Sequence, residues 1–163
     1  MKTVMFAGTV SWFGGPEDVD GVSAEEGLAF IYEYETHPHL FLADPPIDPD
    51  TGKECTGLAR RLNPEVHYVA CRWDYSITPK TMLARNDLMA LVRNSATGEA
   101  VLAHPAYWGP SEEQTGRAAD VSQQIMEDLG LETDQEVEVI YPIPIHHPSR
   151  MDNQRVIPHD EED

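Results

Sequence analysis

The chain has 163 residues, which suits a single domain, and its 40% apolar content is enough to form a core. It carries 29 acidic and 11 basic residues, for a formal charge of −18. Such a charge disfavours binding to nucleic-acid phosphates and docking to anionic lipid. No apolar run approaches the roughly 18 residues of a membrane span. We therefore expect a folded domain whose partner is neither a nucleic acid nor a membrane.

Short strands dominate the predicted structure. β-branched and aromatic residues predict a first strand over residues 3–13, and alternating apolar residues predict a second over 28–34. Further strands are predicted over 66–71, 88–93, 99–103 and 136–141. Residues 94–98 are Asn-Ser-Ala-Thr-Gly, a composition typical of a hairpin turn.

One helix is predicted clearly, over residues 123–129. Ser122 is the expected N-cap and Gly130 suits the position just after the helix. One face of this helix is apolar, with Ile125, Met126 and Leu129.

Long proline-rich segments separate and follow these elements. Residues 36–57 hold four prolines and several acidic turn signals, and they predict a long loop. We expect one domain over residues 1–141, interrupted by an inserted loop at about 35–65, and an extended acidic tail over 142–163. Many short strands with one or two short helices predict an all-β fold, a small β-barrel or sandwich.

The two cysteines, Cys55 and Cys71, leave two interpretations open. They are either reduced, partly buried thiols or one disulfide formed in an oxidising compartment. Neither their spacing nor their number is that of a zinc site.

Two histidine pairs raise the question of a metal. A strand would place His37 and His39 on one face, and residues 146–147 form the second pair. Both pairs lie in proline-rich loops without a further ligand at metal-site spacing, so we expect no metal. No phosphate loop, dinucleotide fingerprint or nucleophile elbow occurs, and we expect no cofactor.

Asp120 lies between a glycine-containing loop and the predicted helix. In one interpretation it is a cap or hydrogen-bond anchor, since a helix N-terminus favours a charged carboxylate. In the other it is a functional carboxylate.

Two stretches, residues 72–75 and 104–110, combine aromatic and polar side chains that could line a groove. Aromatic faces beside carboxylates suit sugar rings, which have both an apolar face and hydroxyl groups. The alternative is that Trp73 and Trp108 are core residues with a hydrogen-bonded indole N–H.

Four segments resemble one family in the same order along the chain. Residues 8–14, Gly-Thr-Val-Ser-Trp-Phe-Gly, resemble the opening G-x-A-S-W-Y-G of double-psi β-barrels of the RlpA-like and expansin-like kind. Residues 91–99 resemble the family hairpin, residues 109–110 the end of its N-D-R-G-P, and residues 116–122 its G-R-x-I-D-L-S. The resemblance covers residues 8–14 and about 66–141, and implies a double-psi barrel.

In this family the aspartate of the last motif lies in an open groove that holds a polysaccharide. The lytic members resemble transglycosylases that cut peptidoglycan with one acid that later acts as base. The resemblance thus implies that Asp120 is catalytic, with a pKa raised by burial or by a carboxylate such as Asp74. The implied substrate-binding residues are Tyr75, His104, Tyr107, Trp108 and Arg117.

Two departures from the pattern point towards binding. Lytic members carry a histidine in A-A-H, where residues 69–72 are Val-Ala-Cys-Arg, and Tyr107 replaces the acidic residue of N-D-R-G-P. Expansins, which loosen polysaccharide without hydrolysing it, depart similarly. We expect a barrel that binds polysaccharide, with peptidoglycan as the partner, or cuts it weakly.

The alternative is a non-catalytic structural or interaction subunit, such as a phage virion or tail component. The loop at 35–65 and the tail would then contact other protein subunits. No secretory signal is recognisable before Trp12. The location is left open between the cytoplasm and, for a protein delivered as phage proteins are, the cell wall.

Overall fold

The computed structural model describes residues 2–14, 37–42, 52, 62–85, 87–107, 116–145 and 154–156. Its seven strands are β1 (Val4–Trp12), β2 (Tyr68–Cys71), β3 (Leu88–Asn94), β4 (Ala100–Tyr107), β5 (Arg117–Val121), β6 (Glu136–Pro144) and β7 (Gln154–Val156). Its helices are α1 (Lys80–Leu83), α2 (Gln123–Asp128) and the 3₁₀ turn η2 (Pro38–Leu40).

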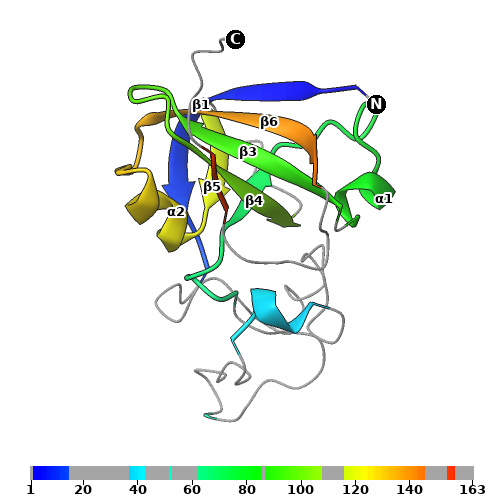
Figure 1. The fold of residues 1–163 in the computed structure, drawn as a ribbon, viewed down its shortest axis with the longest axis horizontal. Helices are drawn as coiled ribbons and strands as arrows, with labels where there is room; N and C mark the ends of the chain where they lie inside the picture. The colour runs from blue at the N-terminus through cyan, green and yellow to red at the C-terminus, as the bar shows by residue number, and fades with distance from the viewer. Residues whose placement is uncertain are drawn as a thin grey trace.

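Six of the strands close into a barrel (Figure 1). The order is β2-β5-β1-β6-β3-β4, and β4 pairs back with β2. The β1–β5 and β2–β4 pairs are parallel and the other four are antiparallel. β7 pairs with β4 over residues 100–102. The predicted all-β fold, a small barrel with two short α-helices, is confirmed.

The first strand bends so that it serves two parts of the barrel. Up to Thr9 it pairs with β6, and beyond the irregularity at Thr9 and Val10 it runs along β5, as Figure 1 shows for the blue strand. At the crossing, a side chain at Gly8 would overlap the carbonyl oxygen of Gly116, and the Thr9 N–H donates to that oxygen at 2.8 Å. A glycine at position 8 thus allows two backbones to approach closely.

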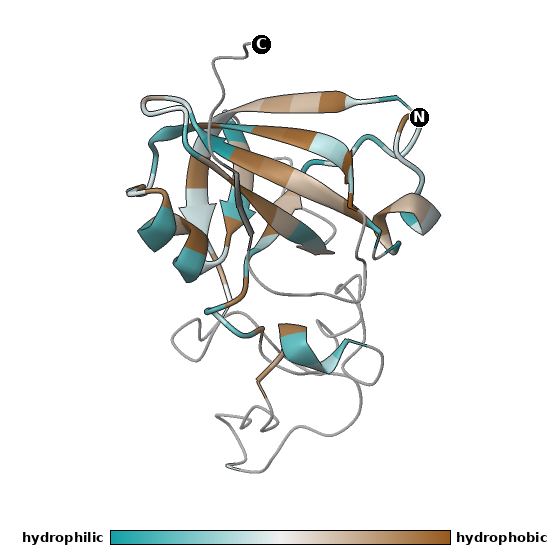
Figure 2. Ribbon diagram, viewed as in Figure 1, coloured by the Kyte–Doolittle hydropathy of each residue, from teal (hydrophilic) through white to brown (hydrophobic). Residues whose placement is uncertain are grey.

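The core fills the inside of the barrel, and apolar residues line its strands in Figure 2. Trp73 is 6% exposed and packs edge-on against Phe6 and Tyr141, with ring centroids 5.9 and 5.4 Å away. Its indole N–H donates to the Tyr107 carbonyl oxygen at 2.9 Å. Trp73 is therefore a core residue, as the alternative interpretation held, and Trp108 lies outside the described residues.

A second apolar cluster covers part of the outer face of β2 and β4. Its buried members are Leu40, Phe41, Leu62, Tyr68 and Ala106. The Tyr68 hydroxyl also donates to the carbonyl oxygen of Phe13 at 2.7 Å. The segment around η2 is packed against the barrel by this cluster.

Most predicted elements in the described residues are confirmed, with one exception. Residues 117–121, for which no strand was predicted, form β5. Asp120 thus belongs to a strand, and the cap shown at α2 is Ser122, whose Oγ accepts from the Ile125 N–H at 3.4 Å. The strand predicted over 28–34 lies outside the described residues. The strand predicted over 136–141 is longer than expected, because β6 continues to Pro144.

Among the described residues, no helix has the length and apolar character needed to cross a membrane.

Candidate functional site

The strand register places Asp120 in a row of residues across the outside of the barrel. Asp120 pairs with Ser11 of β1 on one side and with Ala70 of β2 on the other, and Ala70 pairs with Tyr107 of β4. Paired residues point to the same face, and neighbouring strands are about 4.8 Å apart. The flanking residues Val10, Val69, Ala119 and Val121 belong to the core. The row therefore faces outwards, and Asp120 in it is partly exposed.

The next residue of β2, Cys71, points into the barrel. It is a fully buried free thiol that pairs with Ala119. Burial raises the pKa of Cys71 well above its ordinary value, and the charge of Asp120 raises it further. A neutral, buried thiol therefore lies diagonally across the β2–β5 pair from Asp120. Cys55 lies outside the described residues.

Asp74 lies in the turn beyond the end of β2, and it is not a cross-strand partner of Asp120. One of its carboxylate oxygens, Oδ1, accepts hydrogen bonds from the Ser76 hydroxyl at 2.6 Å and from the Ser76 N–H at 3.0 Å. These bonds lower the pKa of the fully exposed Asp74. Asp74 is therefore an ionised turn residue near neutral pH.

The two described tyrosines among the predicted binding residues are both accessible. Tyr75 is 40% exposed, and Lys80 Nζ lies 5.2 Å from the centre of its ring. Partial burial raises the pKa of Tyr75. Tyr107, at the end of β4, is partly exposed and packs edge-on against Phe13 at 5.7 Å. Each ring could contact a sugar, but only Tyr107 stands in the row with Asp120.

Arg117 joins parts of the barrel to one another. Its Nη1 donates to the Val10 carbonyl oxygen at 2.6 Å and lies 3.0 Å from the Asp134 carboxylate. Only 18% of its side chain is exposed. This guanidinium therefore holds β5 against β1 and the turn before β6.

His104 is buried at the contact between β4 and the segment around η2. Its ring lies 5.7 Å from that of His39, which is 6.2 Å from that of His37. Burial, with the positive charges of His39, His37 and His67, lowers the pKa of His104 to about 3. With only 1% of its surface exposed, His104 cannot contact a polysaccharide at the surface.

The described residues contain no group of three or more His, Cys, Asp or Glu side chains that could hold a metal ion. The nearby His67 is instead bound to a carboxylate, with Nε2 2.7 Å from Asp128 Oδ2. Residues 146–147 lie outside the described part of the chain.

The sequence did not predict a groove beside α2 that is bordered by Trp12. Trp12 is 37% exposed and borders an open groove of about 560 Å³ beside α2. The groove is also lined by Gln123, Met126, Glu127, Leu131, Glu132 and Thr133. Trp12 pairs with Val121, directly after the Ser11–Asp120 pair, so the groove lies at the same end of β1 as Asp120 but on the other face of the strand. The tryptophan of the opening motif was the available signal.

The chain matches no model of a known protein family, and no curated protein is similar enough to count as a relative. A barrel fold alone does not define a function, because unrelated functions occur on the same fold.

Proposed function

We propose that the protein is a double-psi β-barrel that binds polysaccharide, with peptidoglycan as the first candidate, through the surface around Asp120. The closed six-stranded barrel with two parallel ladders supports the fold assignment. The close crossing at Gly8 and Gly116 also supports it, because both glycines belong to the segments that resemble the family.

The observation that carries the proposed function is the row Ser11–Asp120–Ala70–Tyr107, with Trp12 directly after it. The carboxylate can accept hydrogen bonds from sugar hydroxyls, and the serine hydroxyl can both donate and accept. The tyrosine and tryptophan rings offer faces for the apolar side of a sugar ring. The accessible members of the row are Ser11, Asp120 and Tyr107, because Ala70 is only 2% exposed. The groove at Trp12 lies close by at the same end of β1, on the other face of the strand.

Binding without cleavage is the form of this function that the contacts favour. A general acid for glycosidic bonds needs a raised pKa. Asp74, the expected helper of Asp120, has a lowered pKa and lies beyond the end of β2. The residue paired with Asp120 in β2 is Ala70, and the next residue of β2, Cys71, is a buried thiol. Ser122, two residues after Asp120, is occupied as the cap of α2. Neither Asp74 nor Cys71 therefore serves as the second carboxylate or the histidine expected of the lytic mechanism.

The test is a pull-down of the full chain on purified insoluble peptidoglycan, combined with zymography on the same material. We expect retention without clearing, and about a tenfold loss of affinity in Asp120→Asn, because a carboxylate bonded to hydroxyls contributes about 1.5 kcal/mol. Asp87→Asn is the matched control. Asp87 is paired with Arg85 at 2.7 Å, outside the Asp120 row, and its variant should bind as the wild type does.

Two other results would decide against this proposal. Clearing by the wild type but not by Asp120→Asn would show a lytic enzyme. If the wild type is neither retained on peptidoglycan nor clears it, the polysaccharide function is removed and the structural or interaction subunit is favoured.

A further inference from the structure

We infer that the groove beside Trp12 selects an amine-bearing glycan, a polymer of amino sugars whose nitrogens are free and protonated. This inference rests on the proposed function and specifies the class of sugar that the surface prefers.

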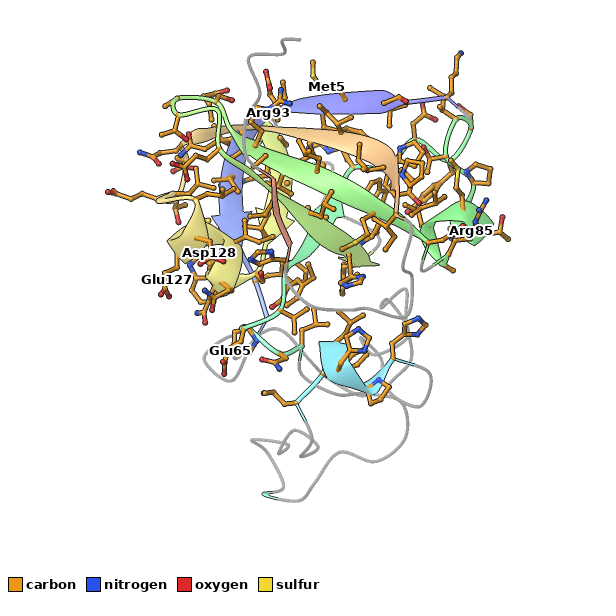
Figure 3. The ribbon with its side chains drawn as sticks, viewed as in Figure 1. Met5, Glu65, Arg85, Arg93, Glu127 and Asp128 are labelled. Carbon is orange, nitrogen blue, oxygen red and sulfur yellow. The ribbon has the colours of Figure 1, made fainter. Side chains whose placement is uncertain are left out.

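The lining of the groove combines an aromatic face with two carboxylates. Trp12, Met126 and Leu131 provide apolar surface, while Glu127 on α2 and Glu132 after it provide charge. Figure 3 shows the Glu127 side chain pointing away from the helix on the outside of the molecule. A sugar ring can stack on the indole, and an ammonium group on that ring is attracted both by the carboxylates and by the indole face.

The two glutamates differ from the acidic residues next to them. Asp128 is bound to His67 and to Gln124, and Asp134 is paired with Arg117. Among the ion pairs of the described residues, none involves Glu127 or Glu132, and both residues are exposed. The groove thus offers two carboxylates that no cation of the described chain neutralises.

The charge of the whole chain favours the same class of ligand. At a formal charge of −18, an anionic polymer is repelled and a cationic one is attracted at moderate salt. The groove lies at the same end of β1 as the Asp120 row, because Ser11–Asp120 and Trp12–Val121 are successive pairs, although successive pairs point to opposite faces of the sheet. This nearness to the proposed polysaccharide surface is the reason for preferring a glycan to a basic peptide.

The inference is tested by calorimetric titration of the full chain with two oligomers of equal length, one of glucosamine and one of N-acetylglucosamine. Acetylation removes the charge and leaves the sugar backbone unchanged. We expect the glucosamine oligomer to bind about tenfold more tightly at low salt, and this preference to shrink as salt is added.

Variants connect the preference to the groove. Glu127→Gln and Glu132→Gln should each reduce the preference about threefold and leave binding of the acetylated oligomer unchanged. Trp12→Ala should weaken both oligomers. Asp87→Asn removes the same charge outside the groove and should leave the preference intact.

Three results would overturn the inference. Equal affinity for both oligomers would overturn the preference for an amine-bearing glycan. The proposed function would still stand in that case if binding depended on Asp120. A lysine oligomer that binds as tightly as the glucosamine oligomer, with the same dependence on Glu127, would replace the sugar by a basic peptide. If the protein binds neither oligomer and does not bind peptidoglycan, both the inference and the proposed function are removed.

Discussion

His104 has a much lower pKa in the folded chain than in the unfolded chain. In the barrel its pKa is about 3, because of burial and the neighbouring His39, His37 and His67, whereas an unfolded histidine has a pKa of about 6.5. Between these values the unfolded chain binds a proton that the folded chain excludes. Stability therefore falls as the pH falls below about 6.5, and the loss is complete near pH 3.

We predict that the free energy of unfolding at about pH 5 is roughly 2 kcal/mol lower than at about pH 8 from this site alone. His37 and His39 also have lowered pKa values, so they add a loss of the same sign. The measurement is urea unfolding at several pH values for the wild type and His104→Gln. The variant removes the titrating group and should show a shallower decline, whereas identical slopes would place the acid sensitivity elsewhere.

The sequence could not indicate this role of His104. The residue stands in an aromatic and polar stretch that predicts a surface groove. Whether it faces solvent depends on the segment around η2, which packs over β4 from more than 60 residues earlier in the chain. The sequence did single out Asp120 as a candidate site residue, because the motif at residues 116–122 contains it. It did not predict that Asp120 lies in a strand.

At the scale of elements, Asn94 at the end of β3 shows how one side chain joins a turn to a helix. The Asn94 amide donates to the Leu129 carbonyl oxygen at the end of α2 at 2.8 Å, and its oxygen accepts from the Ala96 N–H at 2.9 Å. Asn94 is 5% exposed, so these bonds are shielded from water. The hairpin is thereby fixed to the helix.

Asn94→Ala should lower the free energy of unfolding by about 2 kcal/mol, because it leaves the Leu129 carbonyl buried without this donor. Chemical denaturation followed by tryptophan fluorescence would measure the loss. Ser95→Ala, at the exposed neighbouring position, is the control and should change stability by less than about 0.5 kcal/mol. Equal effects of the two substitutions would show that the buried amide is not what joins the turn to the helix.

The elements also show where local patterns are sufficient. The 94–98 turn, Ser122 and Gly130 were predicted because each depends on residues a few positions away, and Gly130 has the left-handed φ of +61°. β5 was missed because Arg-Ala-Ala-Asp-Val has little intrinsic strand preference. It becomes a strand because β1 and β2 pair with it on both sides.

At the scale of the whole molecule, closure of the barrel creates what no stretch of sequence contains. The groove combines Trp12 with residues 123–133, which lie more than 100 positions away in the chain. Closure brings them together because the end of β1 runs beside β5, which leads directly into α2. The resemblance predicted the barrel, whereas the shape and lining of the groove required the folded chain.

Closure of the barrel also depends on which face of β6 points inwards. Val137, Val139 and Tyr141 are fully buried, while Glu138 and Ile140 between them are partly exposed. β6 pairs with both β1 and β3, so its buried face lies at the centre of the barrel. A charge on that face would have no partner among the core residues that surround it.

We predict that Val139→Asp unfolds the domain. Burial of an unpaired carboxylate costs several kcal/mol, about as much as the whole stability of a small domain. Ile140→Asp places the same charge one residue away on the outer face, where water can reach it, and should leave the barrel folded. Circular dichroism and the thermal midpoint compare the two. A folded Val139→Asp with an unfolded Ile140→Asp would mean that β6 presents its other face to the core, and the outward direction assigned to the Asp120 row would then need the same revision.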